Sequence, residues 1–144
     1  MAIGLLLPLL VQSAHVASAR DASERSVAML RERPCLTQDR SDAVSVAQQI
    51  DTTRDEIGAL DAAFRSLWPS SSSPAFNKPA INVAATKLTL ALSRLASGHA
   101  RLVLALAGTG PVCLEPLTAA NQAIREHFDG FQNPAGRAHT FTLP

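Results

Sequence analysis

Two histidines are the residues of this 144-residue chain whose positions could support chemistry. His99 stands within an apolar helical stripe, and His127 stands beside Ile124 and Phe128 at the edge of another. If the two helices are antiparallel neighbours, counting back from Cys113 puts both imidazoles within about one or two helical turns of the same level. Facing histidines in a helical bundle can hold a metal ion or a haem iron.

The sequence offers little else for a metal site. It contains no Glu-x-x-His or His-x-x-x-His spacing, and Glu126 is the only carboxylate directly adjacent to either histidine. A histidine at the edge of a core is more often a packed side chain with one hydrogen bond than a metal ligand. We therefore expect no cofactor and no metal site, and keep His99 and His127 as candidates for the alternative.

The only two cysteines, Cys35 and Cys113, flank the two longest helical segments. An antiparallel hairpin brings the residue before its first helix and the residue after its second to the same end, which permits a disulfide bond. A disulfide would favour an oxidising compartment. Because two cysteines form no spacing pattern that tests their pairing, two free thiols remain the alternative.

No sequence pattern predicts catalysis. The serines at 70–73 stand in a proline-bounded linker without the glycines of a nucleophile elbow. Gly108-Thr109-Gly110 lacks the strand and the spacing of a nucleotide-binding loop, and is typical of a helix end. We predict that the protein is not an enzyme.

The positions of the histidines and cysteines depend on a long helical hairpin. Apolar residues recur in steps of three and four over 43–67 and over 81–106, which puts each set on one side of a helix. Pro69 and Pro74 bracket the serines between these segments, a composition that reverses the chain. The two stripes are Ala43, Val46, Ile50, Thr53, Ile57, Leu60, Phe64 and Leu67, and Ile81, Ala85, Leu88, Leu92, Leu95, His99, Leu102 and Leu106.

Two shorter helices are expected beside this hairpin, one over 21–33 and one from about 115. The end of the hairpin, over 102–107, is apolar all round and must be covered on more than one side. The sequence therefore predicts an all-α, four-helix-bundle-like fold, a long antiparallel helical hairpin with two shorter helices packed against it, over 20–129. An extended or mobile C-terminal tail is expected over 130–144.

Charge favours the same antiparallel pairing. Residues 41–64 carry five acids and one base, Arg54, whereas residues 70–114 carry four bases and no acid. Folding the chain at the serine linker brings Arg94 level with Asp51. Because an exposed ion pair contributes less than about 1 kcal/mol, these charges would select orientation more than they add stability.

Residues 1–19 have the pattern of a secretory signal peptide. Residues 3–16 are mostly apolar, and Ala17-Ser18-Ala19 offers the small residues that precede a cleavage site. The stretch is short for a membrane span, which needs about 20 apolar residues. No Lys or Arg precedes the apolar run, so an uncleaved membrane anchor and a first helix packed into a bundle both remain open.

Composition narrows the classes of function. A hydrophobic content of 47% argues against disorder, and a net charge of +1 with 4% aromatic residues argues against nucleic-acid binding. We therefore expect a small secreted or periplasmic coiled-coil-like bundle that binds another protein and is not an enzyme. The alternatives are a helical subunit of an intracellular or membrane-associated assembly, attached through residues 1–19, and a metal- or haem-binding bundle.

Overall fold

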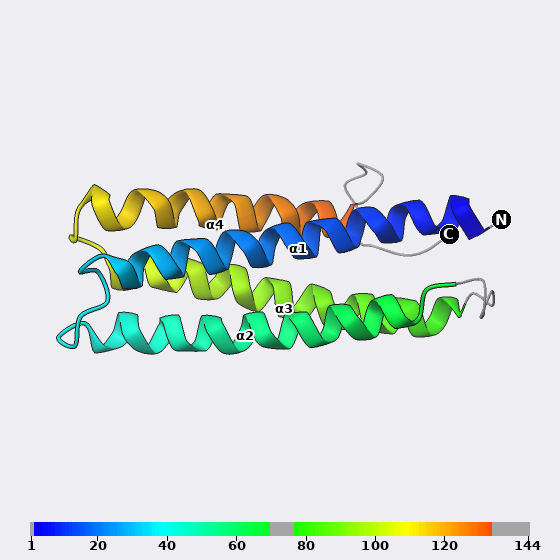
Figure 1. The fold of residues 1–144 in the computed structure, drawn as a ribbon, viewed down its shortest axis with the longest axis horizontal. Helices are drawn as coiled ribbons and strands as arrows, with labels where there is room; N and C mark the ends of the chain where they lie inside the picture. The colour runs from blue at the N-terminus through cyan, green and yellow to red at the C-terminus, as the bar shows by residue number, and fades with distance from the viewer. Residues whose placement is uncertain (1, 70–76, 134–144) are drawn as a thin grey trace.

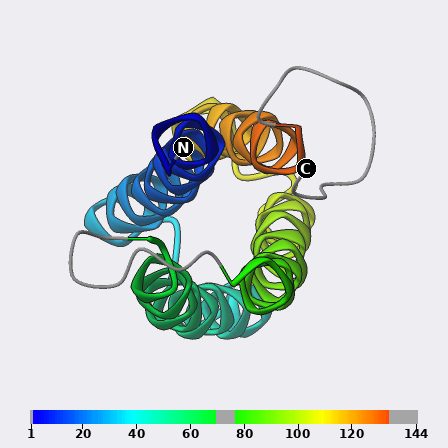
Figure 2. The same cartoon turned by 90° about the vertical axis from the view of Figure 1, so that its right-hand side faces the viewer.

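The protein forms an antiparallel bundle of four helices in a computed structural model that describes residues 2–69 and 77–133, with side chains from Leu7 onward. The helices are α1 (Ala2–Glu32), α2 (Ser41–Ser66), α3 (Lys78–Ala105) and α4 (Pro111–Gln132). They run alternately in opposite directions (Figure 1) and surround a single core when seen end-on (Figure 2). The predicted all-α, four-helix-bundle-like fold is confirmed.

The helices pack most extensively as two pairs, α2 with α3 and α1 with α4. The α2–α3 pair is the predicted hairpin, and every residue of the predicted α3 stripe is buried. In α2 the side chains of Ala43, Ile50, Ile57 and Phe64 are buried, and the others of its predicted stripe are partly covered. The apolar period therefore located the hairpin core correctly.

Local signals set the ends of α3. The Asn77 side chain accepts a 3.1 Å hydrogen bond from the Ala80 amide, which caps the helix, and Pro79 occupies its first turn. After α3, Gly108 and Gly110 take φ values of 87° and 96°, a region that favours glycine. Pro111 then begins α4. These glycines let the chain reverse within a few residues.

Helix α1 differs from the short helix expected over 21–33, because it spans 31 residues. It carries a third stripe in steps of three and four, and every member is buried. Three of the seven members are polar, so an apolar count does not reveal the period. The members are Leu9, Gln12, Val16, Ala19, Ser23, Ser26 and Leu30.

At both ends of the chain, helices extend past the limits that the sequence predicted for the helical domain. Residues 2–19 form the first part of α1, and four of their side chains belong to its buried stripe, so the interpretation as a cleaved signal peptide stays a prediction. Within residues 2–69 and 77–133, none of the helices combines the length and the apolar character needed to cross a bilayer. Helix α4 continues to Gln132, past the expected start of the tail at 130, and residues 134–144 lie outside the described residues.

Candidate functional site

The two cysteines form a disulfide at one end of the bundle. Cys35, in the connection from α1 to α2, is joined to Cys113 in the first turn of α4, with Cα atoms 5.9 Å apart. Both are buried, and no cysteine of the described residues is free. Beside the bridge, the Arg33 side chain donates a 2.6 Å hydrogen bond to the Val112 carbonyl. The disulfide links residues separated by 78 positions and fixes this end of the α1–α4 pair.

His99 lies wholly inside the bundle. Its Nε2 atom is 2.8 Å from the Oγ of Ser23 on α1, and both residues have no exposed surface. Its Nδ1 atom is buried and has no hydrogen-bond partner in the part of the chain that the structure describes. Burial, with a smaller contribution from Arg54, lowers the pKa of His99 to about 4. The imidazole is therefore neutral at neutral pH.

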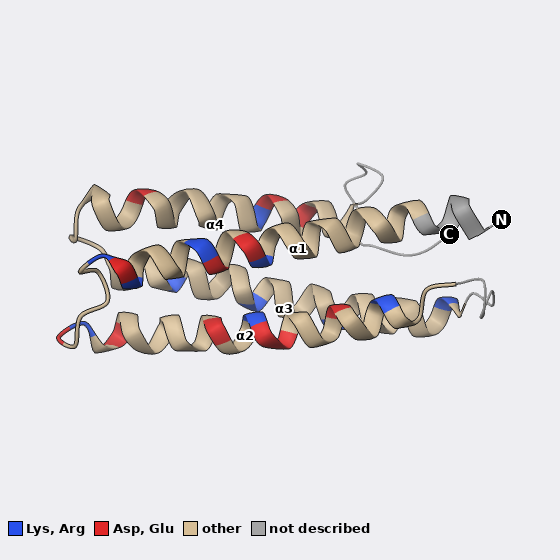
Figure 3. Ribbon diagram, in the orientation of Figure 1, with Lys and Arg blue, Asp and Glu red and all other residues tan. Residues whose placement is uncertain are grey.

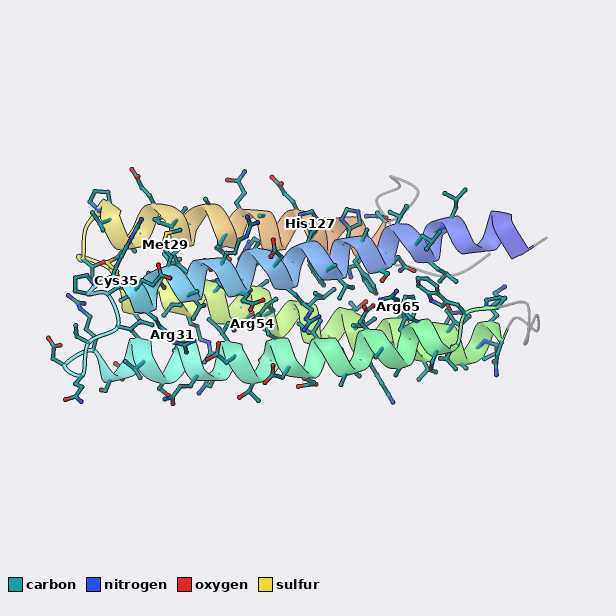
Figure 4. All side chains as sticks on the ribbon, viewed as in Figure 1. Met29, Arg31, Cys35, Arg54, Arg65 and His127 are labelled. Atoms are coloured by element: carbon teal, nitrogen blue, oxygen red, sulfur yellow. A yellow bond between two sulfur atoms is a disulfide. The ribbon has the colours of Figure 1, made fainter. Side chains whose placement is uncertain are left out.

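Two arginines connect the Ser23–His99 contact to the surface. Arg54 of α2 donates one hydrogen bond to Ser23 Oγ, at 3.2 Å, and another to Asp51, at 2.5 Å. Asp51 also accepts a 2.5 Å hydrogen bond from Arg31 of α1 (Figure 4). Burial alone would raise the pKa of Asp51, but the hydrogen bonds from Arg31 and Arg54 outweigh it and hold the pKa below its usual range. We call Ser23, Arg31, Asp51, Arg54 and His99 the polar layer.

The predicted pairing of Arg94 with Asp51 is not formed. Arg94 instead forms an ion pair with Glu56, and Asp51 pairs with Arg31 of α1 and Arg54 of α2. Arg101 donates a 3.1 Å hydrogen bond to Gln49 of α2. Figure 3 shows α3 with basic residues and no acidic ones. The opposite charges of α2 and α3 meet as expected, in a register that differs by five residues, or about 7.5 Å along α2.

The Ser23–His99 contact has the residue types of a nucleophile and its base, but not the accessibility. Both side chains are fully buried, and among the described residues no third group bonds to Nδ1 and orients the imidazole. The serine hydroxyl is therefore covered by the side chains around it. The polar layer is better explained as a structural device, since buried polar contacts can fix the register of packed helices.

His127 does not meet His99. Its Nδ1 atom lies 2.9 Å from the Nδ1 atom of His15 on α1, with the ring centroids 5.2 Å apart. The α1 partners of the two predicted histidines, His15 and Ser23, are eight residues apart, or about 12 Å along the helix. The sequence placed His99 and His127 within about one or two helical turns of the same level, as a possible facing pair, but they do not face each other. The two histidines belong to separate contacts.

The sequence pattern did not reveal His15, because it stands in the segment with a signal-peptide pattern. The Nε2 edge of its ring lies against Gly130 of α4, where a β-carbon would come within 2.4 Å of two ring atoms. Burial, with a smaller effect of His127, lowers the pKa of His15. Only the register of α1 against α4 brings His15, His127 and Gly130 together, so no local signal could have found them.

A second polar contact lies between α1 and α2. Asp61 is nearly buried, and this burial raises its pKa although Arg65, Arg20 and a hydrogen bond from Ser13 oppose the shift. The Arg20 guanidinium crosses α2 over Gly58, where a β-carbon would lie 2.8 Å from its Nη2. This contact adds to the polar character of the side of α1 that faces the bundle.

The outer surface carries a row of apolar side chains on α3. Val83, Leu90 and Leu104 are 56%, 58% and 75% exposed, at intervals of seven and fourteen residues. Beside this row a hollow between α3 and α4 is lined by Ser93, Ala96, Ser97, Arg125, Phe128 and Asp129. We call the three apolar residues the α3 row.

Fold and contacts together define a disulfide-closed four-helix bundle with a buried polar layer. Comparisons with protein-family models, curated proteins and solved structures find no match for this chain. Among the described residues, no cluster of three or more His, Cys, Asp or Glu side chains is placed to hold a metal ion.

Proposed function

We propose that this protein is a non-enzymatic binding protein of an oxidising compartment, and that it recognises a helix of another protein through the α3 row. The exposure of Val83, Leu90 and Leu104 carries the proposal. The core-facing side of α3 is formed by other residues, so folding does not require large apolar side chains at these positions. Exposed apolar side chains gathered on one face are typical of an interaction site.

The spacing of the row favours a helical partner. Residues seven apart lie on the same side of a helix, and a seven-residue repeat is the period at which two helices pack along a seam. Ser97 stands between Leu90 and Leu104 and opens into the hollow between α3 and α4. A partner helix could place one apolar side chain in this hollow and align others with the row, as in helix-in-groove recognition.

Two charged side chains of α3 are directed away from the α3 row and leave it apolar. Arg94 and Arg101 are engaged by Glu56 and Gln49 of α2, so they are turned away from the α3 row. The hollow is bordered by Arg125 and Asp129, which have opposite charges and could form a polar rim. An apolar row with a polar rim is the usual composition of a protein interface.

The disulfide supports a secreted or periplasmic location, because such bonds persist in oxidising compartments. Residues 1–19, with their signal-peptide pattern, would direct the export. A second candidate is a subunit of a membrane-associated assembly. It is favoured by Leu7 and Leu10, which are 59% and 53% exposed near the start of α1.

Site-specific photocrosslinking tests the proposed partner. A photoreactive amino acid would be placed at Leu90 in the full chain, in its native host, and a matched one at Ala62, which is exposed on α2. We expect a discrete adduct with another protein from position 90 and none from position 62, with the crosslink in a helical segment of the partner. Leu90→Glu should abolish the same adduct from a probe at Val83 while the circular dichroism is unchanged. Equal crosslinking from both positions, or adducts with a second copy only, would refute the proposal.

A further inference from the structure

We propose that His15 and His127 form a binding site for one divalent transition-metal ion of the kind that imidazole prefers, with Cu²⁺ bound most tightly. The inference is independent of the α3 row, and it concerns the chain that keeps residues 1–19, because His15 lies in the first part of α1. It rests on the distance between the two Nδ1 atoms, on the packing that holds the rings, and on their partial exposure.

The separation of the two nitrogens suits two ligands of one ion. The Nδ1 atoms lie 2.9 Å apart, from helices α1 and α4. Two nitrogens at about 2.0 Å from an ion are about 2.8 Å apart in neighbouring positions of a tetragonal site and about 3.3 Å apart in a tetrahedral one. In the metal-free protein the ring centroids are 5.2 Å apart, so each Nδ1 points almost straight at the other. Both lone pairs converge on one ion only after a ring turns away from this line, and the spacing of the nitrogens then suits the tetragonal preference of Cu²⁺.

The packing around His15 holds its ring in place before any ion binds. The Nε2 edge of His15 lies against Gly130, and this leaves its Nδ1 atom directed at His127. One turn earlier on α1, the Gln12 side chain donates a 3.0 Å hydrogen bond to the Phe131 carbonyl and ties the two helices at this level. A glycine inside a helix costs about 1 kcal/mol relative to alanine. At position 130 this cost has a structural reason, because the His15 ring occupies the space of a β-carbon. Ligands held in this way are the usual condition for a well-formed metal site.

Binding of the ion to the two neutral imidazoles requires no release of a proton. In the metal-free protein one Nδ1 donates a hydrogen and the other accepts it. When the ion binds, that proton moves to Nε2 of the same ring, and both Nδ1 lone pairs coordinate. Because no third His, Cys, Asp or Glu among the described residues is placed to coordinate, water would complete the coordination of the ion.

An ion at this position would fasten α1 to α4 at a second point. His15 lies seventeen residues before the end of α1 at Glu32, or about 25 Å along the helix from the disulfide end. The disulfide and the ion would then hold the α1–α4 pair at two separated levels. Binding to the folded state alone would raise the melting temperature.

Titration of Cu²⁺ into the full oxidised chain tests the site, with calorimetry for stoichiometry and electron paramagnetic resonance for the ligands. We expect one saturable ion, a spectrum with two nitrogen ligands, and a higher melting temperature. His15→Gln and His127→Gln should each abolish the saturable phase, whereas His139→Gln should leave it intact. Gly130→Ala should weaken binding while both ligands remain, because its methyl group would displace the His15 ring.

Several outcomes would overturn the site. Binding of Cu²⁺ that is the same in wild type and in the His15→Gln/His127→Gln double variant would show that the ion binds elsewhere. Loss of binding on His139→Gln alone would contradict a site made by two histidines. If either Gln variant unfolds, the number of nitrogen ligands in the wild-type spectrum and the effect of Gly130→Ala decide the question. A spectrum without nitrogen ligands, or unchanged affinity in Gly130→Ala, would then refute the proposal.

Discussion

The Nε2 atom of His99 lies 2.8 Å from the Oγ of Ser23, and this contact joins α3 to α1 across the diagonal of the bundle. These two helices otherwise touch only slightly, because α2 and α4 lie between them (Figure 2). A polar contact at the centre of an apolar core is satisfied in one register of the helices and lost in others. We infer that the polar layer selects the alignment of α1 against the α2–α3 hairpin.

The stability of the bundle should fall on acidification because of His99. Its pKa of about 4 lies below the ordinary value of 6.5, so between these two pH values the unfolded chain binds a proton that the folded chain does not. The free energy of unfolding should therefore decrease as pH falls from 6.5, by about 3 kcal/mol once the pH is below 4. Urea unfolding of wild type and His99→Leu at pH 7 and pH 4.5 measures this contribution. An equal pH dependence in both proteins would contradict it.

Ser23 and His99 should show energetic coupling. Ser23→Ala and His99→Leu each leave a buried polar partner with one hydrogen bond fewer, at a cost of about 1–3 kcal/mol. The double variant should cost less than the sum of the single ones, because neither partner then remains. Ser26→Ala is the control, since the Ser26 hydroxyl bonds to the Ser23 carbonyl of its own helix, and its effect should add to that of His99→Leu. A double-mutant cycle by chemical denaturation measures both cases.

The disulfide should contribute strongly to the stability of the bundle. It links residues separated by 78 positions, and closing a loop of this length lowers the entropy of the unfolded chain by an amount equivalent to about 4 kcal/mol. Cys35→Ser/Cys113→Ser should therefore lower the denaturant midpoint, and dithiothreitol should lower that of wild type to a similar value. The double variant itself should not respond to dithiothreitol. An unchanged midpoint after reduction would show that the bond adds no stability.

Removal of residues 1–19 should destabilise the bundle if those residues belong to the folded protein. The truncation deletes Leu9 and Val16, which have no exposed surface, and each buried side chain of this size contributes about 1.5–3 kcal/mol. A chain that begins at Arg20 should then unfold at a much lower denaturant concentration than the full chain. Equal midpoints would instead support the interpretation of residues 1–19 as a removable signal peptide. Intact mass of the exported protein would establish which form the cell keeps.

The sequence by itself determined the hairpin and its ends. The α3 stripe from Ile81 to Leu106 is dense in apolar residues, and a repeat of this kind is a local property that one helix displays without its neighbours. Prolines and glycines at the chain reversals act within a few residues in the same way. The expectation that Cys35 and Cys113 reach one end followed from the two helix lengths alone, and the structure places them there.

Only the tertiary structure decided what α1 contributes. Residues 1–19 have the pattern of a signal peptide, so the first helix was expected only from about 21, and the buried stripe includes Gln12, Ser23 and Ser26, which a count of apolar residues does not register. The contacts of His15 with His127 and of Ser23 with His99 join residues 112 and 76 positions apart. Such contacts depend on how far one helix is shifted along another. That shift is set by packing across the whole core, and no local pattern encodes it.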